Sequence, residues 1–584
     1  MFLRAIRRIP ARYRPLAGAL ALLLTAWVSM YGKIWSFEAK SEHRFTAKAI
    51  LTGTLRLHGL VTHAGHDEQV YNGAVYTNWG FGVPLLQAPF HALAGAASTL
   101  GFFPDRAIYF IYLAATMPVL WAAFERLLAM KEPPGTPRAW RLAVSWAATW
   151  MVLNVTLFPF MSTRFVVYEE AVSYLMICEL LALGAYVFAL RSWRPVHVGA
   201  MALASGVGLL VRPIGAVYLA VWGLLVLLER RRKRTQLFGI VAAPFVAFFL
   251  YSNWVRSGSL LGLGYGNSNP AYEFETPILR FGSVCVDTPA HLAQTAARLF
   301  NGFFFYVAPR SSSAWMEHCH FGLEERDKAG DPFFGPGVLV LLVGMLCGLV
   351  RRRERRLSVY VPHAAIAALF VLFVLRGNGF AWRYVGDFWP LVILASVQYV
   401  LTLPAPAVMP FDLRLTKILF WTGFAALARF LVPWEWAYRA DILSPGQVAT
   451  MAEDFRSARW DTEAALPSRL SCDERPDPQV PYHNGLGWHP GCFVGTYTNV
   501  YLGVARKEDD SYTLRFETQG ISAPTVKVYV NGSVYTAYRR GNPYEADVRL
   551  HYGALRSPSV MVTLLWTRDD EPPPGSKLLS VELV

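Results

Sequence analysis

Charged residues are scarce in this chain. Asp, Glu, Lys and Arg make up 16% of its 584 residues, whereas a soluble protein of this length has nearer ~25%. Hydrophobic residues reach 54%, and the mean hydropathy is +0.30. The composition excludes an ordinary soluble domain and is typical of a helical membrane protein.

Common signatures of soluble chemistry are also missing. No Walker loop, GxSxG elbow, HExxH pair or dinucleotide-binding glycine pattern stands in a suitable context. No cysteine or histidine spacing indicates a zinc site. A nucleotide cannot supply energy on the outer face of a membrane, so an enzyme working there needs a donor that arrives already activated in the bilayer.

Apolar runs recur over the first 433 residues, each about as long as a ~30 Å hydrocarbon layer requires. We expect about eleven spans, at residues 15–35, 105–130, 141–159, 171–190, 196–211, 214–229, 235–252, 336–350, 358–376, 388–403 and 415–433. Basic clusters at helix ends mark the cytoplasmic side: Arg4–Arg14, Arg138/Arg141, Arg191/Arg194, Arg230–Arg234 and Arg351–Arg356. The net charge of +14 therefore reflects membrane topology rather than nucleic acid binding.

This arrangement predicts a bacterial inner-membrane protein with its amino terminus in the cytoplasm. Loops 36–104 and 253–335 and the tail 434–584 then lie in the periplasm. All basic clusters lie on the cytoplasmic side only if the apolar stretch 83–103 does not cross the membrane. We therefore expect this stretch to form an interfacial helix with Pro84 and Pro89 as kinks. The alternative is a twelfth span, which would place the later basic clusters outside.

The cysteines follow the same map. Cys178 and Cys347 lie within predicted spans, where we expect them to serve as packing residues. Four others fall on the predicted oxidising side: Cys285, Cys319, Cys472 and Cys492. The first two share one outer loop and the last two share the tail, which favours two disulfides. Four unpaired thiols are the alternative.

The tail from Trp434 has a different composition, richer in charge, Pro and Gly. After a mixed, helical piece at about 445–470, short alternating runs predict strands: Tyr512–Glu517, Val526–Val530, Val534–Tyr538, Asp547–Tyr552, Val560–Trp566 and Leu578–Val584. Asn531-Gly532 supplies a hairpin turn. We therefore expect a small periplasmic domain, 434–584, resembling a β-sandwich, and leave open whether it binds sugar.

Three acidic positions in the outer region are candidates for a functional role. Residues 41–51 are expected to be helical, with Glu42 near the amino-terminal end. A carboxylate there can accept a proton from a hydroxyl group, or it can simply favour the helix dipole. Glu170 precedes the span from Ala171, where a buried acid is costly and hence a functional candidate. Asp67 lies in a His/Gly-rich loop, where a solvated surface charge is the commoner explanation.

Arginines at the outer ends of spans are candidates for holding a lipid phosphate, because the guanidinium fork suits phosphate oxygens. Arg212, before Pro213, and Arg383, in Trp382–Asp387, are placed there. The alternatives are snorkelling to lipid headgroups, or pairing of Arg383 with Asp387.

The order of several motifs resembles GT-C superfamily glycosyltransferases, particularly bacterial protein O-mannosyltransferases and the lipid A aminoarabinose transferase. The matching segments are Glu42–Leu51, Tyr71–Leu86 with Pro89, Arg106, Phe165–Glu170, Leu210–Pro213, Asn253–Gly266, Asn301–Pro309 and Arg383–Pro390. The chain departs from this pattern at Ser41-Glu42, where the family has an Asp-Glu pair. The resemblance covers most of residues 1–433.

Such enzymes transfer a sugar from a polyprenyl-phosphate donor to an acceptor on the outer side of the membrane. The resemblance implies a GT-C-like catalytic region, 1–433, with Glu42 as the first choice for activating the acceptor and Glu170 or Asp67 as supporting acids. Arg212, Arg44 and Arg383 would hold the donor phosphate. The cavity would be lined by Tyr71, Tyr76, Asn78, Trp79 and Tyr265.

The partners expected on this reading are the lipid-linked donor, a lipid, glycan or protein acceptor, and the bilayer, with no nucleic acid. The cofactor requirement stays open, and a divalent cation is one option. The rival class is a transporter or flippase for a lipid-linked glycan, which typically has charged residues inside its spans. The predicted spans contain few Asp, Glu or Lys residues. A third reading is a non-catalytic envelope assembly protein.

Overall fold

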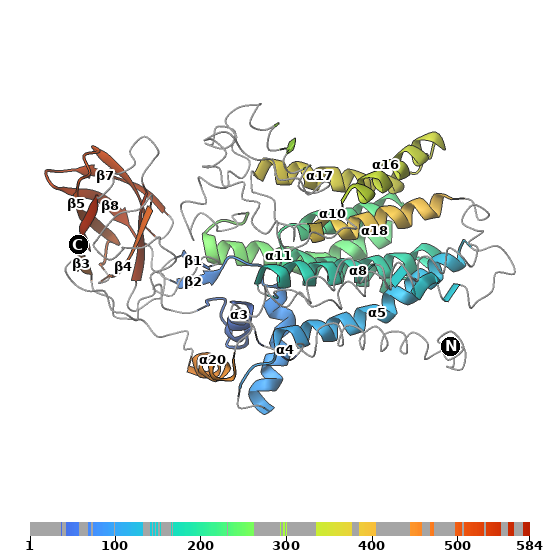
Figure 1. Cartoon of the computed structure of the whole chain (residues 1–584), viewed down its shortest axis with the longest axis horizontal. Coiled ribbons are helices and arrows are strands. Elements are labelled where there is room, and N and C mark those ends of the chain that lie inside the picture. The colour runs from blue at the N-terminus through green and yellow to red at the C-terminus, as the bar shows by residue number, and fades with distance from the viewer. Residues whose placement is uncertain are drawn as a thin grey trace. The chain divides into compact units, whose positions relative to one another are not determined.

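The computed structural model shows a helical region and a β-rich tail (Figure 1). The residues that it describes are 35, 37, 42–57, 68–71, 74–97, 100–131, 141, 142, 144–146, 148, 149, 152, 165, 167–229, 232–261, 293, 296, 297, 300, 335–376, 385–403, 444–457, 468–471, 497–504, 507–530, 533–550, 559–565 and 576–584.

The chain divides into two compact units. The first comprises Met1–Arg44, Gly80–Phe249 and Ile278–Glu453. The second comprises Phe45–Trp79, Leu250–Pro277 and Asp454–Val584. The first unit holds most of the apolar helices, and the second holds both β-sheets.

The helices begin and end as follows: α3 Glu42–Leu51, α4 Gly82–Ala97, α5 Asp105–Ala129, α8 Val167–Ser192, α9 Pro195–Val211, α10 Gly215–Leu228, α11 Arg232–Ser257, α16 Gly335–Arg351, the 3-10 helix η4 Leu357–Val359, α17 Val361–Arg376, α18 Val385–Thr402 and α20 Pro445–Ser457. The predicted helix at 41–51 is confirmed as α3, and the predicted helical piece after 445 is present as α20.

Among the described residues, three helices are long and apolar enough to cross a membrane: Asp105–Ala129, Glu169–Ser192 and Arg232–Ser257. Apolar helices also occupy five other expected spans, but each is shorter: Pro195–Val211, Gly215–Leu228, Val338–Arg351, Val361–Val374 and Gly386–Thr402. The expected span 415–433, all of 15–35 except Trp35, and most of 141–159 lie outside the described residues. These lengths and compositions indicate a membrane protein, while the total of eleven spans stays a prediction.

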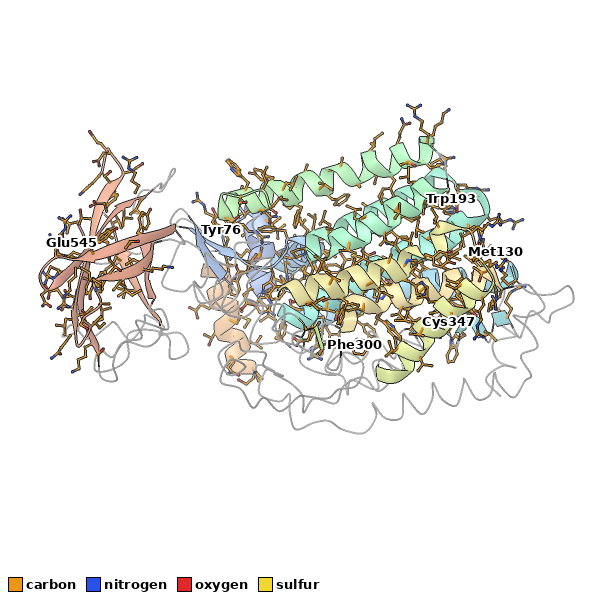
Figure 2. The ribbon with its side chains drawn as sticks, turned by 90° about the horizontal axis from the view of Figure 1, so that it is seen from above. Tyr76, Met130, Trp193, Phe300, Cys347 and Glu545 are labelled. Carbon is orange, nitrogen blue, oxygen red and sulfur yellow. The ribbon has the colours of Figure 1, made fainter. Side chains whose placement is uncertain are left out.

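Helix α8 is the centre of the helical region. It packs against α5, α9 and α18, and Figure 1 shows α5, α8 and α18 running in roughly the same direction. In its apolar window 89% of the residues are buried, against 22% in α11. Helix α11 therefore presents most of its surface outward. Cys178 is buried in α8, as expected of a packing residue. Cys347 was expected to pack in the same way, but it is exposed on α16 (Figure 2).

Local sequence explains where the functional helices begin and end. Helix α5 follows Pro104, whose backbone is extended, and opens with Asp105, a carboxylate that the helix dipole favours at this end. Helix α9 begins at Pro195, because proline suits the first helical position. It ends at Val211; the next residue, Arg212, has an extended backbone with a φ of −148°, and Pro213 follows it.

A short hairpin in the second unit was not predicted from the sequence. Strand β1, Glu68–Tyr71, pairs with β2, Ala74–Thr77, with Tyr71 opposite Ala74. Two residues, Asn72 and Gly73, join the strands, and Asn-Gly is the strongest short hairpin signal. The signal was present, but these residues were interpreted as part of a family motif.

The tail strands form one antiparallel sheet. They are β3 Arg469–Ser471, β4 Tyr497–Gly503, β5 Ser511–Gln519, β6 Thr525–Val530, β7 Ser533–Arg539, β8 Pro543–Arg549, β9 Ser559–Leu565 and β10 Lys577–Leu583. Their order is β3-β10-β5-β8-β7-β6-β9-β4. Strands β7 and β8 pair at Tyr538↔Glu545 and Arg539↔Tyr544. The β7–β8 pairing divides the sheet into two halves, β3-β10-β5-β8 and β7-β6-β9-β4. If the eight tail strands are numbered 1 to 8 from β3 to β10, these halves read 1-8-3-6 and 5-4-7-2. This is the strand order that two Greek keys give in a jelly roll.

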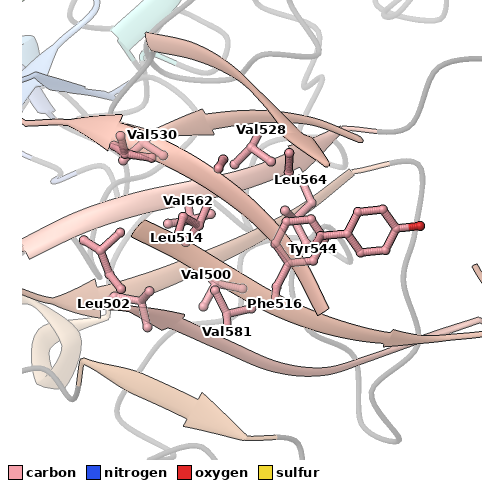
Figure 3. Packing of buried hydrophobic residues seen from close by; sticks show 14 of the residues in the cluster. Val500, Leu502, Leu514, Phe516, Val528, Val530, Tyr544, Val562, Leu564 and Val581 are labelled. Carbon is pink, nitrogen blue, oxygen red and sulfur yellow. The ribbon is translucent and has the colours of Figure 1, made fainter. Parts of the chain in front are cut away.

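Alternating side chains from both halves of this sheet fill one core (Figure 3). Val526, Val528 and Val530 are all buried, as their alternation predicts, and Val530 pairs with Ser533 across the predicted Asn531-Gly532 turn. The strand expected from Asp547 instead begins at Pro543, because β8 pairs along β5 as far as Glu517. Strands β3 and β4 were not expected.

Candidate functional site

The amino-terminal ends of three helices bring four charged residues together in the first unit. The Arg44 guanidinium, from α3, donates through Nη2 to Oδ2 of Asp105 at the start of α5. The Glu170 carboxyl, from α8, interacts electrostatically with Asp105, Arg44 and Glu42. We call Glu42, Arg44, Asp105 and Glu170 the Arg44 cluster. Three of its members, Glu42, Arg44 and Glu170, were predicted site residues, and Glu170 interacts electrostatically with the other two.

Burial makes this cluster expensive to assemble. Arg44 is 0% exposed, Glu170 1% and Asp105 2%, whereas Glu42 is half-buried. Moving an ion pair out of water costs several kcal/mol per ion unless the partners compensate well. Three carboxyl groups against one guanidinium leave a surplus of negative charge, which favours uptake of a proton. Glu42 is the member of the cluster that retains some exposure, although its Oε2 atom is buried.

Helix α4 turns polar residues toward the cluster and apolar residues outward. The Gln87 amide donates to Oε1 of Glu170, and the His91 ring accepts from the Phe103 N–H at 3.2 Å. Both side chains are buried one turn apart, while Leu93 on the other side is 69% exposed. In α4 the polar side chains are buried and apolar ones are exposed, the opposite of a helix on the surface of a soluble protein. Such a helix suits contact with lipid on one face and with a polar site on the other. With 16 residues, α4 is shorter than the ~20 that cross a bilayer, and its interfacial position stays a prediction.

The imidazole of His91 gives the site a measurable pH dependence. Burial is the main cause that lowers the pKa of His91 to about 4; Arg44 lowers it further and Asp105 opposes the change. Because the folded pKa lies below the unfolded value of ~6.5, the unfolded chain binds this proton first as the pH falls. The stability from neutral His91 is therefore complete above about pH 6.5 and is lost by about pH 4.

We expect the melting temperature in detergent to fall between pH 6.5 and 4, with roughly 3 kcal/mol of the loss due to His91. The His91→Asn variant keeps an acceptor for the Phe103 N–H but does not titrate, so its melting curve should fall less steeply over this range. Identical pH profiles for the variant and the wild type would contradict the assignment.

Two glycines let the segment before α4 approach the end of α9. A Cβ atom on Gly80 would lie 2.0 Å from the carbonyl oxygen of Leu210, and one on Gly82 would lie 2.4 Å from the Val211 nitrogen. Any larger residue would force the backbones apart. The Gly82-Val83-Pro84 motif thereby fixes the start of α4 beside the loop that carries Arg212.

Arg212 lies in a second buried pair. Its Nη2 is 3.1 Å from Oδ2 of Asp387, the first-turn acid of α18, and the Tyr218 hydroxyl donates to the Asp387 main-chain oxygen. The phosphate-binding role predicted for Arg212 stays a prediction; in the structure its guanidinium faces the Asp387 carboxylate. The acid proposed as a partner for Arg383 is thus the partner of Arg212, while Arg383 lies outside the described residues.

The predicted cavity-lining residues of the first outer loop belong to the second unit. Tyr76 lies on β2, and Asn78 and Trp79 form the bend that follows. The Arg256 guanidinium donates to the Trp79 carbonyl at 2.8 Å, and to Oδ1 of Asn253 at 2.6 Å. Arg256 therefore holds this bend in place through its main chain.

Several predicted residues are not placed by the structure. Tyr71 lies on β1, but its side chain is not described. The following lie outside the described residues: Asp67, Tyr265, Arg383, Cys285, Cys319, Cys472 and Cys492. Within the described part of the chain, no group of three or more His, Cys, Asp or Glu side chains could hold a metal ion.

Sequence reasoning missed three residues of this site, namely Asp105, Gln87 and His91. Gln87 and His91 are polar residues four positions apart in an otherwise apolar helix, a spacing that puts both on one face. Asp105 stands directly before Arg106, which the sequence analysis did single out. For all three residues the signal was a polar side chain next to, or within, a mainly apolar helix.

One buried acid lies well inside an apolar helix. Glu179 is 0% exposed within α8, and its Oε2 accepts from the Trp222 indole N–H at 2.7 Å. A Cβ on Gly208 would come within 2.6 Å of Glu179 Oε1, so α9 packs closely over this carboxyl group. An ionisable residue at such a position is a functional candidate by default.

Comparison with known proteins leaves the chain unassigned. No family model matches it. No curated protein matches it either. Among solved structures, it is similar to arabinosyltransferase EmbB from Mycobacterium smegmatis, with 12% identity and a TM-score of 0.34. The likeness covers 99% of this chain and 65% of that chain. A TM-score this low assigns neither the fold nor the activity.

Proposed function

We propose that the chain is a membrane glycosyltransferase that moves a sugar from a polyprenyl-phosphate donor to an acceptor on the periplasmic side. The observation that carries the proposal is the Arg44 cluster, in which the half-buried Glu42 and the buried Arg44 guanidinium both interact electrostatically with Glu170. The order of GT-C-like motifs along the sequence supports it independently. Apolar helices around the site suit a donor that enters sideways from the bilayer.

The reaction assigns Glu42 the role of proton acceptor. The acceptor hydroxyl oxygen attacks the anomeric carbon of the donor while its proton passes to the Glu42 carboxylate. The bond from that carbon to the phosphate oxygen breaks, and its electron pair leaves on the phosphate. The products are the glycosylated acceptor and polyprenyl phosphate, so charge builds up at the phosphate as the reaction proceeds.

Arg44 is our first choice for stabilising that charge. Its Nη2 is used by Asp105, its Nη1 meets only a thioether, and its Nε has no hydrogen-bond partner among the described residues. Donors placed where charge develops lower the barrier most. Arg212 would have to exchange Asp387 for the phosphate, which makes it second choice. The surplus acids weaken phosphate binding, and this favours release of the product.

Asp105 and Gln87 act as positioning residues. Asp105 orients the guanidinium from one side, and Gln87 holds the Glu170 carboxyl through its amide. Neither needs to touch the sugar. Glu170 is proposed as the supporting acid that keeps the site polar after Glu42 takes its proton.

The proposal is tested with the purified full-length chain in lipid nanodiscs. The protein is incubated with synthetic polyprenyl-phosphate hexoses and pentoses, with membrane extract as the source of acceptors, and released polyprenyl phosphate is measured by mass spectrometry. We expect at least one donor to be consumed. If no donor is consumed and none binds, the proposed function is wrong.

Glu179 is the one observation that favours a transporter instead. A buried carboxyl inside an apolar helix is typical of proteins that carry ions or substrates across the bilayer. A transporter would move a lipid-linked glycan across a liposome membrane without breaking the sugar–phosphate bond. Intact donor on the opposite leaflet, with no free polyprenyl phosphate, would establish that function.

A further inference from the structure

The Arg44 side chain has an unusual partner in helix α20. Its Nη1 donates to the sulfur of Met451, far along the chain. A thioether is a weak acceptor. Arg44 is nevertheless fully buried, and its guanidinium lies 4.5 Å from the ring centroid of Phe102. The contact closes the cluster on one side with a poor hydrogen bond.

The Arg44 guanidinium therefore has fewer good hydrogen-bond acceptors than a buried cation usually has. Asp105 satisfies one of its nitrogens, and a buried donor without a good acceptor costs about 1–3 kcal/mol, more when it is charged. A phosphate oxygen makes a charge-assisted bond that is roughly twice as strong as a neutral one. The place that the Met451 sulfur occupies is therefore one where a phosphate oxygen binds better.

Helix α20 has a self-contained start and a mostly exposed surface. Ser444 and Gln447 form a reciprocal cap at its start: the Ser444 N–H donates to Gln447 Oε1 at 2.9 Å, and the Gln447 N–H donates to Ser444 Oγ at 3.4 Å. Ala452 is buried next to Met451, whereas Thr450 is exposed. The helix thus satisfies its own first turn, and among its described side chains Ala452 is the buried one.

We propose that Met451 is a placeholder for the donor phosphate, so that phosphate binding at Arg44 displaces helix α20. This inference rests on the proposed function, because it takes the phosphate of a prenyl donor as the incoming ligand. The site is closed by α20 without donor and opens as the phosphate takes over Nη1. Met451 thereby sets the affinity for the donor by competing with it.

The first test measures binding of farnesyl phosphate to the full-length chain in nanodiscs by calorimetry. Removing the competing sulfur in Met451→Ala should tighten binding about five-fold. Met451→Leu keeps the volume without the acceptor and should lie between Met451→Ala and the wild type. Thr450→Ala, an exposed neighbour on the same helix, should match the wild type. Unchanged or weaker binding by Met451→Ala would overturn the placeholder role.

The second test follows the movement of the helix. In a Met451→Cys variant, farnesyl phosphate should raise the rate of maleimide labelling at position 451 several-fold, measured on the peptide by mass spectrometry so that native cysteines do not interfere. If farnesyl phosphate binds through Arg44 but the labelling rate at position 451 does not change, the proposed displacement of α20 is wrong, whereas phosphate binding at Arg44 stands. If farnesyl phosphate fails to bind either the wild type or Met451→Ala, the proposed function falls together with this inference.

Discussion

The Glu42→Gln variant is expected to lose sugar transfer by roughly 10²- to 10⁴-fold, the range that a general base contributes. Glutamine has nearly the same shape as glutamate but cannot take a proton from the acceptor hydroxyl. It also removes a negative charge that acts on Glu170, so folding should not suffer. The measurement is donor consumption at saturating acceptor, together with the melting temperature.

Glu354→Gln is the matched control for this variant. Glu354 pairs with Arg356 in the basic segment after α16, at 3.0 Å, and belongs to no part of the proposed site. The same loss of one carboxylate there should leave transfer unchanged. Full activity of Glu42→Gln would remove Glu42 from the mechanism, and equal losses in both variants would point to a general effect of charge.

The Arg44→Met variant is expected to lose both stability and phosphate binding. Removing one partner of a buried ion pair typically costs about 3–5 kcal/mol, because the other charge stays buried and uncompensated. Here that charge is Asp105, which is 2% exposed. The measurements are a denaturant or thermal melt in detergent and calorimetry with farnesyl phosphate.

A double variant separates the two losses. Arg44→Met with Asp105→Asn removes the orphaned charge, so it should recover a large part of the lost stability without recovering phosphate binding. Arg356→Met, which breaks an exposed pair, should alter stability by less than about 1 kcal/mol. Wild-type affinity for farnesyl phosphate in the double variant would exclude Arg44 as the phosphate ligand.

Sequence patterns correctly predicted the helices and strands whose formation depends on neighbouring residues in the chain. The alternation of Val526, Val528 and Val530 fixes which face of β6 is buried, because side chains of a strand point alternately to opposite faces. The apolar runs of α5, α8 and α11 set their lengths in the same way. The start of β8 was misplaced, because its pairing with β5, rather than its own composition, decides where it begins.

The site was only partly predictable, because several of its contacts join residues that are far apart in the sequence. Glu42 and Glu170 stood out as acids at helix starts, which is a local property. That Asp105 orients Arg44, and that Asp387 takes Arg212, depends on partners 61 and 175 positions away (105 − 44 and 387 − 212). No periodicity within one helix specifies such a partner.

The sequence by itself determined that this is a largely apolar, helical chain with a β-rich tail, because composition and period act over a few residues. The tertiary structure decided which charges share one buried place, and it put the Met451 sulfur against the Arg44 guanidinium. The physical reason is that a buried charge takes its partner from whichever helix packing brings near, wherever that helix lies in the chain.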